Sequence, residues 1–379
     1  MRQRFTNKAV LFSVALALLS TGAAVADDQA GPTTIRVDCG QGQSLAQALA
    51  SRARVLVVEF TGTCTGRVDV ARSDVTLRGA DASATVVGGP VVVEGQARVT
   101  FDNFTVRDTP PANIESTAGK GIEVNDSQHV SLSRLTLVNI GNFGIDINAS
   151  TGDLSNTTVT RAANVGVALN RNAAFELAGT VKVTQGGFVG VIVSANAALE
   201  VEEEASLVTT DNGATGLQIE LKGHVTLHSQ LIADRNEVGI NVVDQGGFIY
   251  GNGTIEAANN RVFGVQVGEL ADWTVVAGAV AGVRVVNNGG PGFSVLRNAF
   301  VRLVDGTIIT GNGGPGLLVD GAAVAVRGST ISGNNNGQGD VVLNFGSLAT
   351  FDRSNTLGTP LNCDGTSRAR GQFQCSPTH

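Results

Sequence analysis

The sequence predicts an all-β solenoid, a stack of similar coils built from parallel strands. The first observation is a short phrase of a glycine and two apolar residues that flank a variable one. It returns nine times and fades at a tenth, with its glycines 22 to 28 residues apart: Gly121, Gly144, Gly166, Gly190, Gly216, Gly239, Gly264, Gly292, Gly316 and Gly339. A drifting period of this size, with one strand phrase per unit, is typical of solenoid repeats.

The second observation is a further apolar alternation after each glycine phrase. Examples are 225–227 (Val-Thr-Leu) and 301–303 (Val-Arg-Leu), each a strand with one inward face. Three strands per unit with corners between them fit this spacing, which gives about a dozen coils with a period of about 24. Strands one coil apart would pair in parallel at about 4.8 Å. One domain is enough, because repeats extend in one dimension.

A third regularity is an asparagine shortly before the phrase glycine. The set is Asn212, Asn236, Asn260, Asn288, Asn312 and Asn335. Asparagine tolerates left-handed backbone and bonds its own turn, and stacked amides can also bond to one another along the axis. We therefore expect an amide ladder, next to a glycine that turns the corner.

The N-terminal 26 residues have the pattern of a secretory signal peptide. Arg2, Arg4 and Lys8 form a basic start, residues 9–19 are apolar, and 24–26 (Ala-Val-Ala) is a cleavage site. We expect cleavage near Ala26 and a secreted or periplasmic protein, with a signal simple enough to indicate a bacterial source. No later apolar stretch is long enough to predict a membrane span.

The remaining chain divides into three expected parts. Residues 27–54 form an N-terminal segment with a strand at 34–38 and a short helix at 44–50, whose apolar face would close the open end of the solenoid. Ser44 is the expected N-cap of this helix. The β-helix would occupy 55–350, interrupted by a polar loop at 110–119 that decorates it or forms the wall of a groove. Residues 351–379 form a C-terminal tail held by a disulfide.

Four cysteines predict two disulfides. They are Cys39, Cys64, Cys363 and Cys375, and an even count in an exported chain indicates disulfide bonding. We expect the local pairs Cys39–Cys64 and Cys363–Cys375. A four-cysteine zinc site would need more closely spaced pairs than these.

Two stretches carry a resemblance to a known superfamily. Residues 144–147 (Gly-Ile-Asp-Ile) and 301–312 (Val-Arg-Leu-Val-Asp-Gly-Thr-Ile-Ile-Thr-Gly-Asn) resemble the PbH1 repeat of the pectin lyase-like superfamily. Cys39, the 44–50 helix and residues 74–79 are similar to its usual N-terminal segment. The resemblance covers about 35–350 and implies a single-stranded right-handed parallel β-helix. It implies no single activity, because the fold carries lyases, hydrolases, epimerases and adhesins.

The net charge and the absence of known catalytic motifs exclude several classes of partner and enzyme. Without the signal peptide the 26 basic and 33 acidic residues become 23 and 33, a net charge of −10. This argues against nucleic acid and anionic membranes as partners. The Asn-Thr-Asp, Gly-His-Gly and Arg-Ile-Lys motifs of polygalacturonase-like hydrolases are absent, as are the Trp-Ile-Asp-His motif of pectate lyases and the Asp-Pro-His motif of alginate epimerases.

The candidate catalytic site lies on outward positions of the glycine phrase. With the flanking Ile and Val inward, Glu123 and Asp146 would stack on adjacent coils about 5 Å apart. Like charges this close raise the pKa of one acid, as a general acid needs, or share a calcium ion. Arg107, Arg134 or Arg161 would reach the same side. No cofactor is expected other than Ca²⁺, and no dedicated metal ligands are assigned.

The same face offers a set of ligand-binding candidates. They are Asn125, Asn148, Asn170, Gln218, Glu220, Asn241 and Gln266. Sugar sites usually recruit exposed aromatics, and the sequence offers only Trp273 and Tyr250 for this besides phenylalanines expected in the core. A saccharide groove would therefore rely on amides and acids.

Two functional hypotheses follow. In the first, the protein is an exported, monomeric β-helix that interacts with polysaccharide or serves as a scaffold, without catalysis. The alternative is a polysaccharide lyase or glycoside hydrolase with an unfamiliar acidic site at Glu123 and Asp146. The missing motifs favour the non-enzymatic hypothesis.

Overall fold

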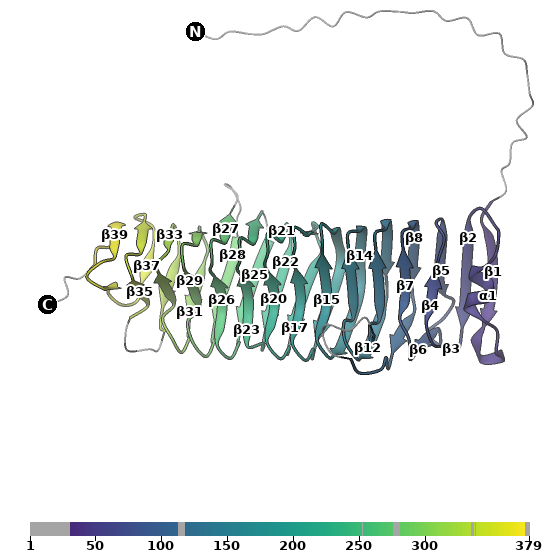
Figure 1. Ribbon diagram of the computed structural model, residues 1–379. Helices are drawn as coiled ribbons and strands as arrows, with labels where there is room; N and C mark the ends of the chain where they lie inside the picture. Colours follow the sequence, from purple (N-terminus) through teal and green to yellow (C-terminus); the bar gives the residue numbers. More distant parts are fainter. Residues whose placement is uncertain are drawn as a thin grey trace, which may run out of the picture. The chain divides into compact units, whose positions relative to one another are not determined.

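The computed structural model describes residues 31–112, 118–251, 253–275, 281–334, 337 and 339–375. It confirms the predicted right-handed parallel β-helix (Figure 1). Every strand pairing among these residues is parallel, and each coil contributes one strand to a 13-stranded sheet and up to two to a 26-stranded sheet. The expected signal peptide, 1–26, lies outside the described residues.

The strands fall into three series that repeat from coil to coil. The 13-stranded sheet, sheet B, consists of β4 (Val68–Val70), β7 (Val91–Glu94), β10 (Ile122–Asn125), β13 (Ile145–Asn148), β15 (Val165–Asn170), β17 (Val189–Val193), β20 (Thr215–Ile219), β23 (Val238–Val242), β26 (Phe263–Val267), β29 (Phe293–Leu296), β32 (Leu317–Asp320), β35 (Val341–Asn344) and β38 (Asn362–Cys363).

The larger sheet, sheet A, contains the other two series. The first is β1 (Thr33–Asp38), β2 (Leu56–Thr61), β5 (Val75–Gly79), β8 (Ala97–Asp102), β11 (Gln128–Ser133), β14 (Thr151–Ala162), β16 (Ala174–Thr184), β18 (Ala198–Val201), β21 (His224–Leu227), β24 (Gly247–Tyr250), β27 (Asp272–Val275), β30 (Phe300–Leu303), β33 (Ala323–Val326), β36 (Leu348–Phe351) and β39 (Arg368–Gly371). The second is β3 (Thr63–Thr65), β6 (Thr85–Val87), β9 (Thr105–Arg107), β12 (Thr136–Ile140), β19 (Ser206–Thr210), β22 (Gln230–Asp234), β25 (Gly253–Ala258), β28 (Ala281–Val286), β31 (Ile308–Thr310), β34 (Thr330–Ser332) and β37 (Thr356–Leu357). The long strands β14 and β16 belong to both series.

The core is a tube of stacked apolar side chains. Ile122, Ile145 and Val167 occupy the same register position on consecutive coils, and all three are buried. β-branched side chains suit this arrangement because they pack coil upon coil with few voids. The backbone groups of each coil are meanwhile satisfied by its neighbours.

The phrase glycines are needed because neighbouring atoms pack closely against their backbone. This corrects the expectation that they turn the corner. Apart from Gly339, with a φ of 105°, their backbones do not lie in the left-handed region. A Cβ on Gly166 would lie 2.1 Å from the Val183 side chain, and one on Gly239 would lie 2.5 Å from the carbonyl oxygen of Gly264. The corner itself is made by residues whose backbone lies in the left-handed region, such as Asp211 and Arg235. Each stands one position before an asparagine of the predicted amide ladder.

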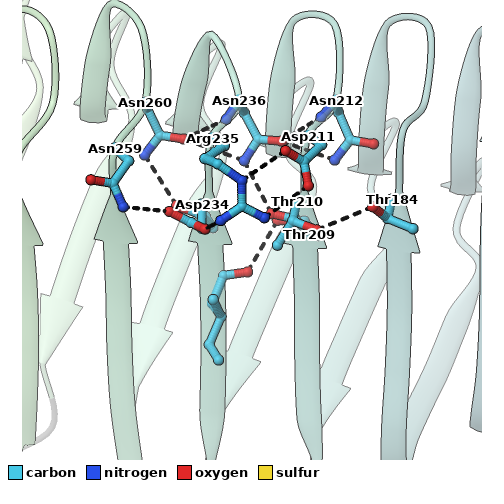
Figure 2. A network of polar contacts seen from close by, with 12 residues as sticks. Thr184, Thr209, Thr210, Asp211, Asn212, Asp234, Arg235, Asn236, Asn259 and Asn260 are labelled. Carbon is cyan, nitrogen blue, oxygen red and sulfur yellow. Dashed lines mark hydrogen bonds and ion pairs between the residues drawn. The ribbon is translucent and has the colours of Figure 1, made fainter.

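The predicted amide ladder is present (Figure 2). Asn212 donates to Asn236 at 2.9 Å, Asn236 to Asn260 at 3.3 Å, and Asn260 to Asn288 at 2.9 Å. The ladder continues through Asn312 and Asn334 and ends on the carboxylate of Asp340. Asn334 takes the place predicted for Asn335, which lies outside the described residues.

Both ends of the solenoid are closed. The helix α1 (Leu45–Leu49), preceded by the 3-10 turn η1 (Cys39–Gln41), buries Leu45, Ala48 and Leu49. Ser44 is its N-cap residue, but its side chain makes no capping hydrogen bond. At the other end the ring of Phe373 packs edge-on against Phe351.

Both predicted disulfides are confirmed. Cys39–Cys64 and Cys363–Cys375 have Cα separations of 5.1 and 5.5 Å. Each lies near one end of the stack. Parallel pairing starts at β1 and reaches β39, so it extends past 55–350 at both ends.

Candidate functional site

Lys120, Glu123 and Asp146 form a buried ion cluster on the outer face of sheet B. β10 and β13 pair in register, which places Glu123 directly beside Asp146 as predicted. The Lys120 Nζ lies 2.7 Å from Glu123 Oε1 and 2.6 Å from Asp146 Oδ2. The three residues are only 7%, 9% and 5% exposed. The acids therefore face away from the core tube, as expected, but they do not face open solvent.

Apolar residues flank this cluster on the same outer face. Val92 is the register partner of Glu123 on the preceding coil, and Ala168 is the partner of Asp146 on the following coil. Both are buried. Ala168 also belongs to a small apolar cluster outside the tube, to which Phe143 packs. The ion cluster therefore lies between apolar neighbours in a water-poor site.

The ammonium group of Lys120 is stabilised by its two partners. Burial alone would lower its pKa, but hydrogen bonds and charge attraction from Asp146 and Glu123 outweigh burial and raise the pKa above 10.5. The cluster therefore sets two carboxyl groups against one ammonium group.

Lys120 is positioned by the long connection between β9 and β10. This connection takes residues 108–121, whereas the next coil makes the same corner in 141–144. Its described part is held to the following coil, because the Thr109 hydroxyl donates to the Gly119 carbonyl and accepts from the Gly141 amide. The Ala112 amide also donates to the carbonyl of Gly141. Sequence periodicity gave no signal for Lys120, because its side chain comes from this insertion.

The ligand-binding candidates form a polar stripe along the outer face of sheet B. We define the stripe as Glu123, Asn125, Asp146, Asn148, Asn170, Ser194, Gln218, Glu220, Asn241 and Gln266. Hydrogen bonds join most of its members in three groups: Asn125 to Glu123 (3.1 Å) and Asn148 to Asn125 (3.1 Å); Asn170 to Asp146 (3.5 Å) and Ser194 to Asn170 (2.8 Å); Gln218 to Glu220 (2.8 Å) and Asn241 to Gln218 (2.9 Å). The structure therefore places the predicted residues along one face of sheet B, with an interruption at the coil of β17, where Ile192 stands at an outward position.

The arginines expected near the acids lie elsewhere. Arg134 pairs with Asp102, Arg107 with Asp108, and Arg161 donates to Asn139. The cation of the site is Lys120.

A second acidic row was missed by the sequence reasoning. Asp153, Glu176 and Glu200 are register partners on β14, β16 and β18, at the floor of a groove of about 520 Å³ on sheet A. His129 also lines this groove. The second apolar alternation contained the signal, since Glu176 and Glu200 each stand between two buried apolar residues of that phrase.

Trp273 does not offer a sugar platform. It is fully buried, stacked on Phe248 and edge-on to Phe293. Large aromatics exposed in the described part of the chain are phenylalanines instead: Phe188, Phe300 and Phe345.

Metal and membrane features are not found within the described ranges. No group of three or more His, Cys, Asp or Glu residues there is arranged to hold a metal ion. No helix in the same part of the chain is long and apolar enough to cross a membrane.

No protein-family model and no curated protein matches the chain. Among solved structures it is similar to the periplasmic alginate epimerase AlgG, with 11% identity and a TM-score of 0.48 over 79% of this chain and 84% of that chain. It is also similar to the A-module of the mannuronan C-5 epimerase AlgE6 of Azotobacter vinelandii, with 16% identity and a TM-score of 0.36 over 86% and 83%. At these values the likeness carries no argument about the site, and the fold rests on the strand pairing described above.

Proposed function

We propose that the protein is an exported polysaccharide-binding β-helix that acts without catalysis, and that the polar stripe is its binding surface. The observation that carries this proposal is the recurrence of hydrogen-bonding groups along the stripe. Amide and carboxylate groups recur on the consecutive strands β10, β13 and β15 and again on β20, β23 and β26, about 4.8 Å apart along the axis. On the intervening coil of β17 the outward residues are Ile192 and Ser194. A hydroxyl-rich chain lying along the axis would meet hydrogen-bonding groups at nearly every coil.

The state of the two acids supports binding over catalysis. A general acid or base must exchange protons with a substrate within hydrogen-bond reach. Glu123 and Asp146 are instead occupied by the ammonium of Lys120 and nearly covered. A catalytic role of these acids stays a prediction, as does calcium binding by them.

The two disulfides support an extracytoplasmic location. Disulfides persist in oxidising compartments, such as the periplasm or the exterior of the cell. Both pairs are formed in the folded chain. A polysaccharide of the cell envelope or of the surroundings is then an accessible partner.

Binding is tested by affinity measurements of the mature protein against a panel of polyuronides and neutral glycans, with and without calcium. The double variant Gln218→Ala, Asn241→Ala should weaken binding at least about tenfold, equivalent to about 1.4 kcal/mol. Gln230→Ala is the matched control, because Gln230 is an exposed amide on sheet A. Equal affinities of the double variant and the control would refute the stripe as the binding surface.

The same incubations test catalysis. Unsaturated or shortened saccharide products would contradict the non-enzymatic proposal. If such products disappear in Asp146→Asn but persist in Asp153→Asn, the acidic site on sheet B is the catalytic one. Intact glycans recovered after prolonged incubation are the result that we expect.

A further inference from the structure

We propose that Lys120 and Asp146 become covalently joined by an isopeptide bond within the folded protein, with Glu123 as the group that moves the protons. The geometry points to this cross-link because an amine, a carboxyl group and a second carboxyl group meet in one buried, apolar-flanked place. The established parts of the fold do not need this arrangement, since strand pairing already joins the two coils.

Proximity favours the reaction. Lys120 Nζ lies 2.6 Å from Asp146 Oδ2, so the carboxyl carbon is no more than one C–O bond farther away. Reacting atoms held about 3–3.5 Å apart in a fixed orientation gain an effective molarity of roughly 10⁵–10⁸ M. Folding holds both groups permanently, so even a slow step would go to completion during the lifetime of the protein.

The cluster holds the right number of protons to form the neutral amine and the neutral carboxylic acid that the reaction needs. Lys120 and the two acids share one ionisable proton between the ammonium and the carboxylates. Moving it from Lys120 to Asp146 by way of Glu123 gives a neutral amine and a neutral acid, with no change in net charge. The paired ammonium is the resting form, and the apolar neighbours Val92 and Ala168 reduce the energy that this proton transfer requires.

The hydrogen bonds assign the two carboxyl groups different roles. Asp146 Oδ1 lies 3.5 Å from the Asn170 amide nitrogen, which can stabilise negative charge that develops there. Glu123 Oε1 accepts from both Lys120 and Asn125, so it lies where it can take a proton from the amine. Asp146 is therefore the electrophile.

The step is balanced without an external reactant. The Lys120 Nζ lone pair forms a bond to the Asp146 carboxyl carbon, and Glu123 takes a proton from the nitrogen. The bond from this carbon to Oδ2 then breaks, and Glu123 returns the proton to the leaving hydroxyl. One water molecule is released, one amide is formed, and Glu123 ends as a carboxylate.

Such a bond would join the long connection before β10 to the next coil, at β13. It would fix the insertion at 108–121 against the face that carries the polar stripe. This inference does not depend on polysaccharide binding, and neither result decides the other.

The experiment is mass spectrometry of the purified, reduced mature protein. We expect an intact mass lower than the sequence mass by one water molecule. In a tryptic digest, cleavage after Lys120 should be blocked, and peptides 108–134 and 135–161 should appear as one branched species. A full sequence mass with normal cleavage after Lys120 overturns the proposal, and so does a water loss confined to one linear peptide.

Variants separate the roles of the residues. Glu123→Gln and Lys120→Arg should each show the full sequence mass, whereas Asp153→Asn, changed in the acidic row on sheet A, should still lose one water. A folded Glu123→Gln protein that carries the 120–146 link overturns the role of Glu123. If a variant does not fold, as judged by its far-ultraviolet circular dichroism, the wild-type peptide map decides the existence of the bond.

Discussion

At the scale of the residue, Asn260 shows what the amide ladder contributes. It accepts from the backbone and side-chain amides of Asn236, and it donates to Asn288 and to the carbonyl of Ala233. We expect Asn260→Ala to lower the free energy of unfolding by about 3 kcal/mol, because each buried polar group left unpaired costs about 1–3 kcal/mol. The measurement is the midpoint of urea unfolding.

Gln230→Ala is the control for this change. Gln230 is an exposed amide with one side-chain hydrogen bond, from Ser206. Its loss should change the free energy of unfolding by less than about 0.5 kcal/mol. If both variants unfold at the same urea concentration, the ladder does not stabilise the folded state.

Periodicity explains which site residues were predictable from the sequence. Glu123, Asp146 and the ladder asparagines recur with the repeat, so their stacking follows from counting residues. Lys120 sits in an insertion, and nothing in the repeat indicates where its amine lies. The burial of both acids was unpredictable for the same reason, since it depends on Lys120 and on apolar neighbours across coils.

At the scale of the element, β21 and β24 contain a pH-sensitive contact. His224 is the register partner of Gly247, and a Cβ on Gly247 would lie 2.7 Å from the imidazole Nδ1. Burial lowers the pKa of His224 below 6.5, since the charged imidazolium loses hydration there. The unfolded chain therefore binds more protons than the folded one just below pH 6.5, and stability should fall as the pH drops through this window.

Urea midpoints measured from about pH 8 to pH 5, where histidine titrates, check this expectation. His224→Gln should flatten the decline. His129→Asn is the control, because His129 is exposed and asparagine tolerates its positive φ of 53°. A decline that persists unchanged in His224→Gln would assign the pH dependence to another group.

Elements were predicted best where strand and corner alternate regularly. The three strand series and the cap helix follow from apolar spacing, and the structure confirms them. The role of the phrase glycine was misjudged, because a sequence does not show which side chain passes close to the backbone. Only the stacked coils reveal that Val183 or a neighbouring carbonyl occupies that space.

At the scale of the whole molecule, stability should be distributed along the axis. In a repeat protein each coil contacts mainly its neighbours, so unfolding can begin at an end and propagate. The ends of the described solenoid are where α1 and Phe373 cover the core and where both disulfides lie. The fold class could be predicted from the sequence repeat alone, because strands in a solenoid pair only with strands of the next coil.

The final prediction concerns these two disulfides. Closing loops of 25 and 12 residues stabilises by about 3.5 and about 3 kcal/mol in the chain-entropy estimate. Each coil contacts mainly its neighbours, so the effect of losing a disulfide should stay local. The double variant Cys363→Ser, Cys375→Ser should therefore loosen the last coil around β37–β39 while the central coils stay folded. Limited proteolysis followed by mass spectrometry should show early cuts after Arg353, Arg368 or Arg370, and a protected fragment that ends near β36.

The variant Cys39→Ser, Cys64→Ser is the matched comparison, with early cuts at Arg36, Arg52 or Arg54 instead. Simultaneous loss of all coils in either variant would show that the solenoid unfolds as one cooperative unit.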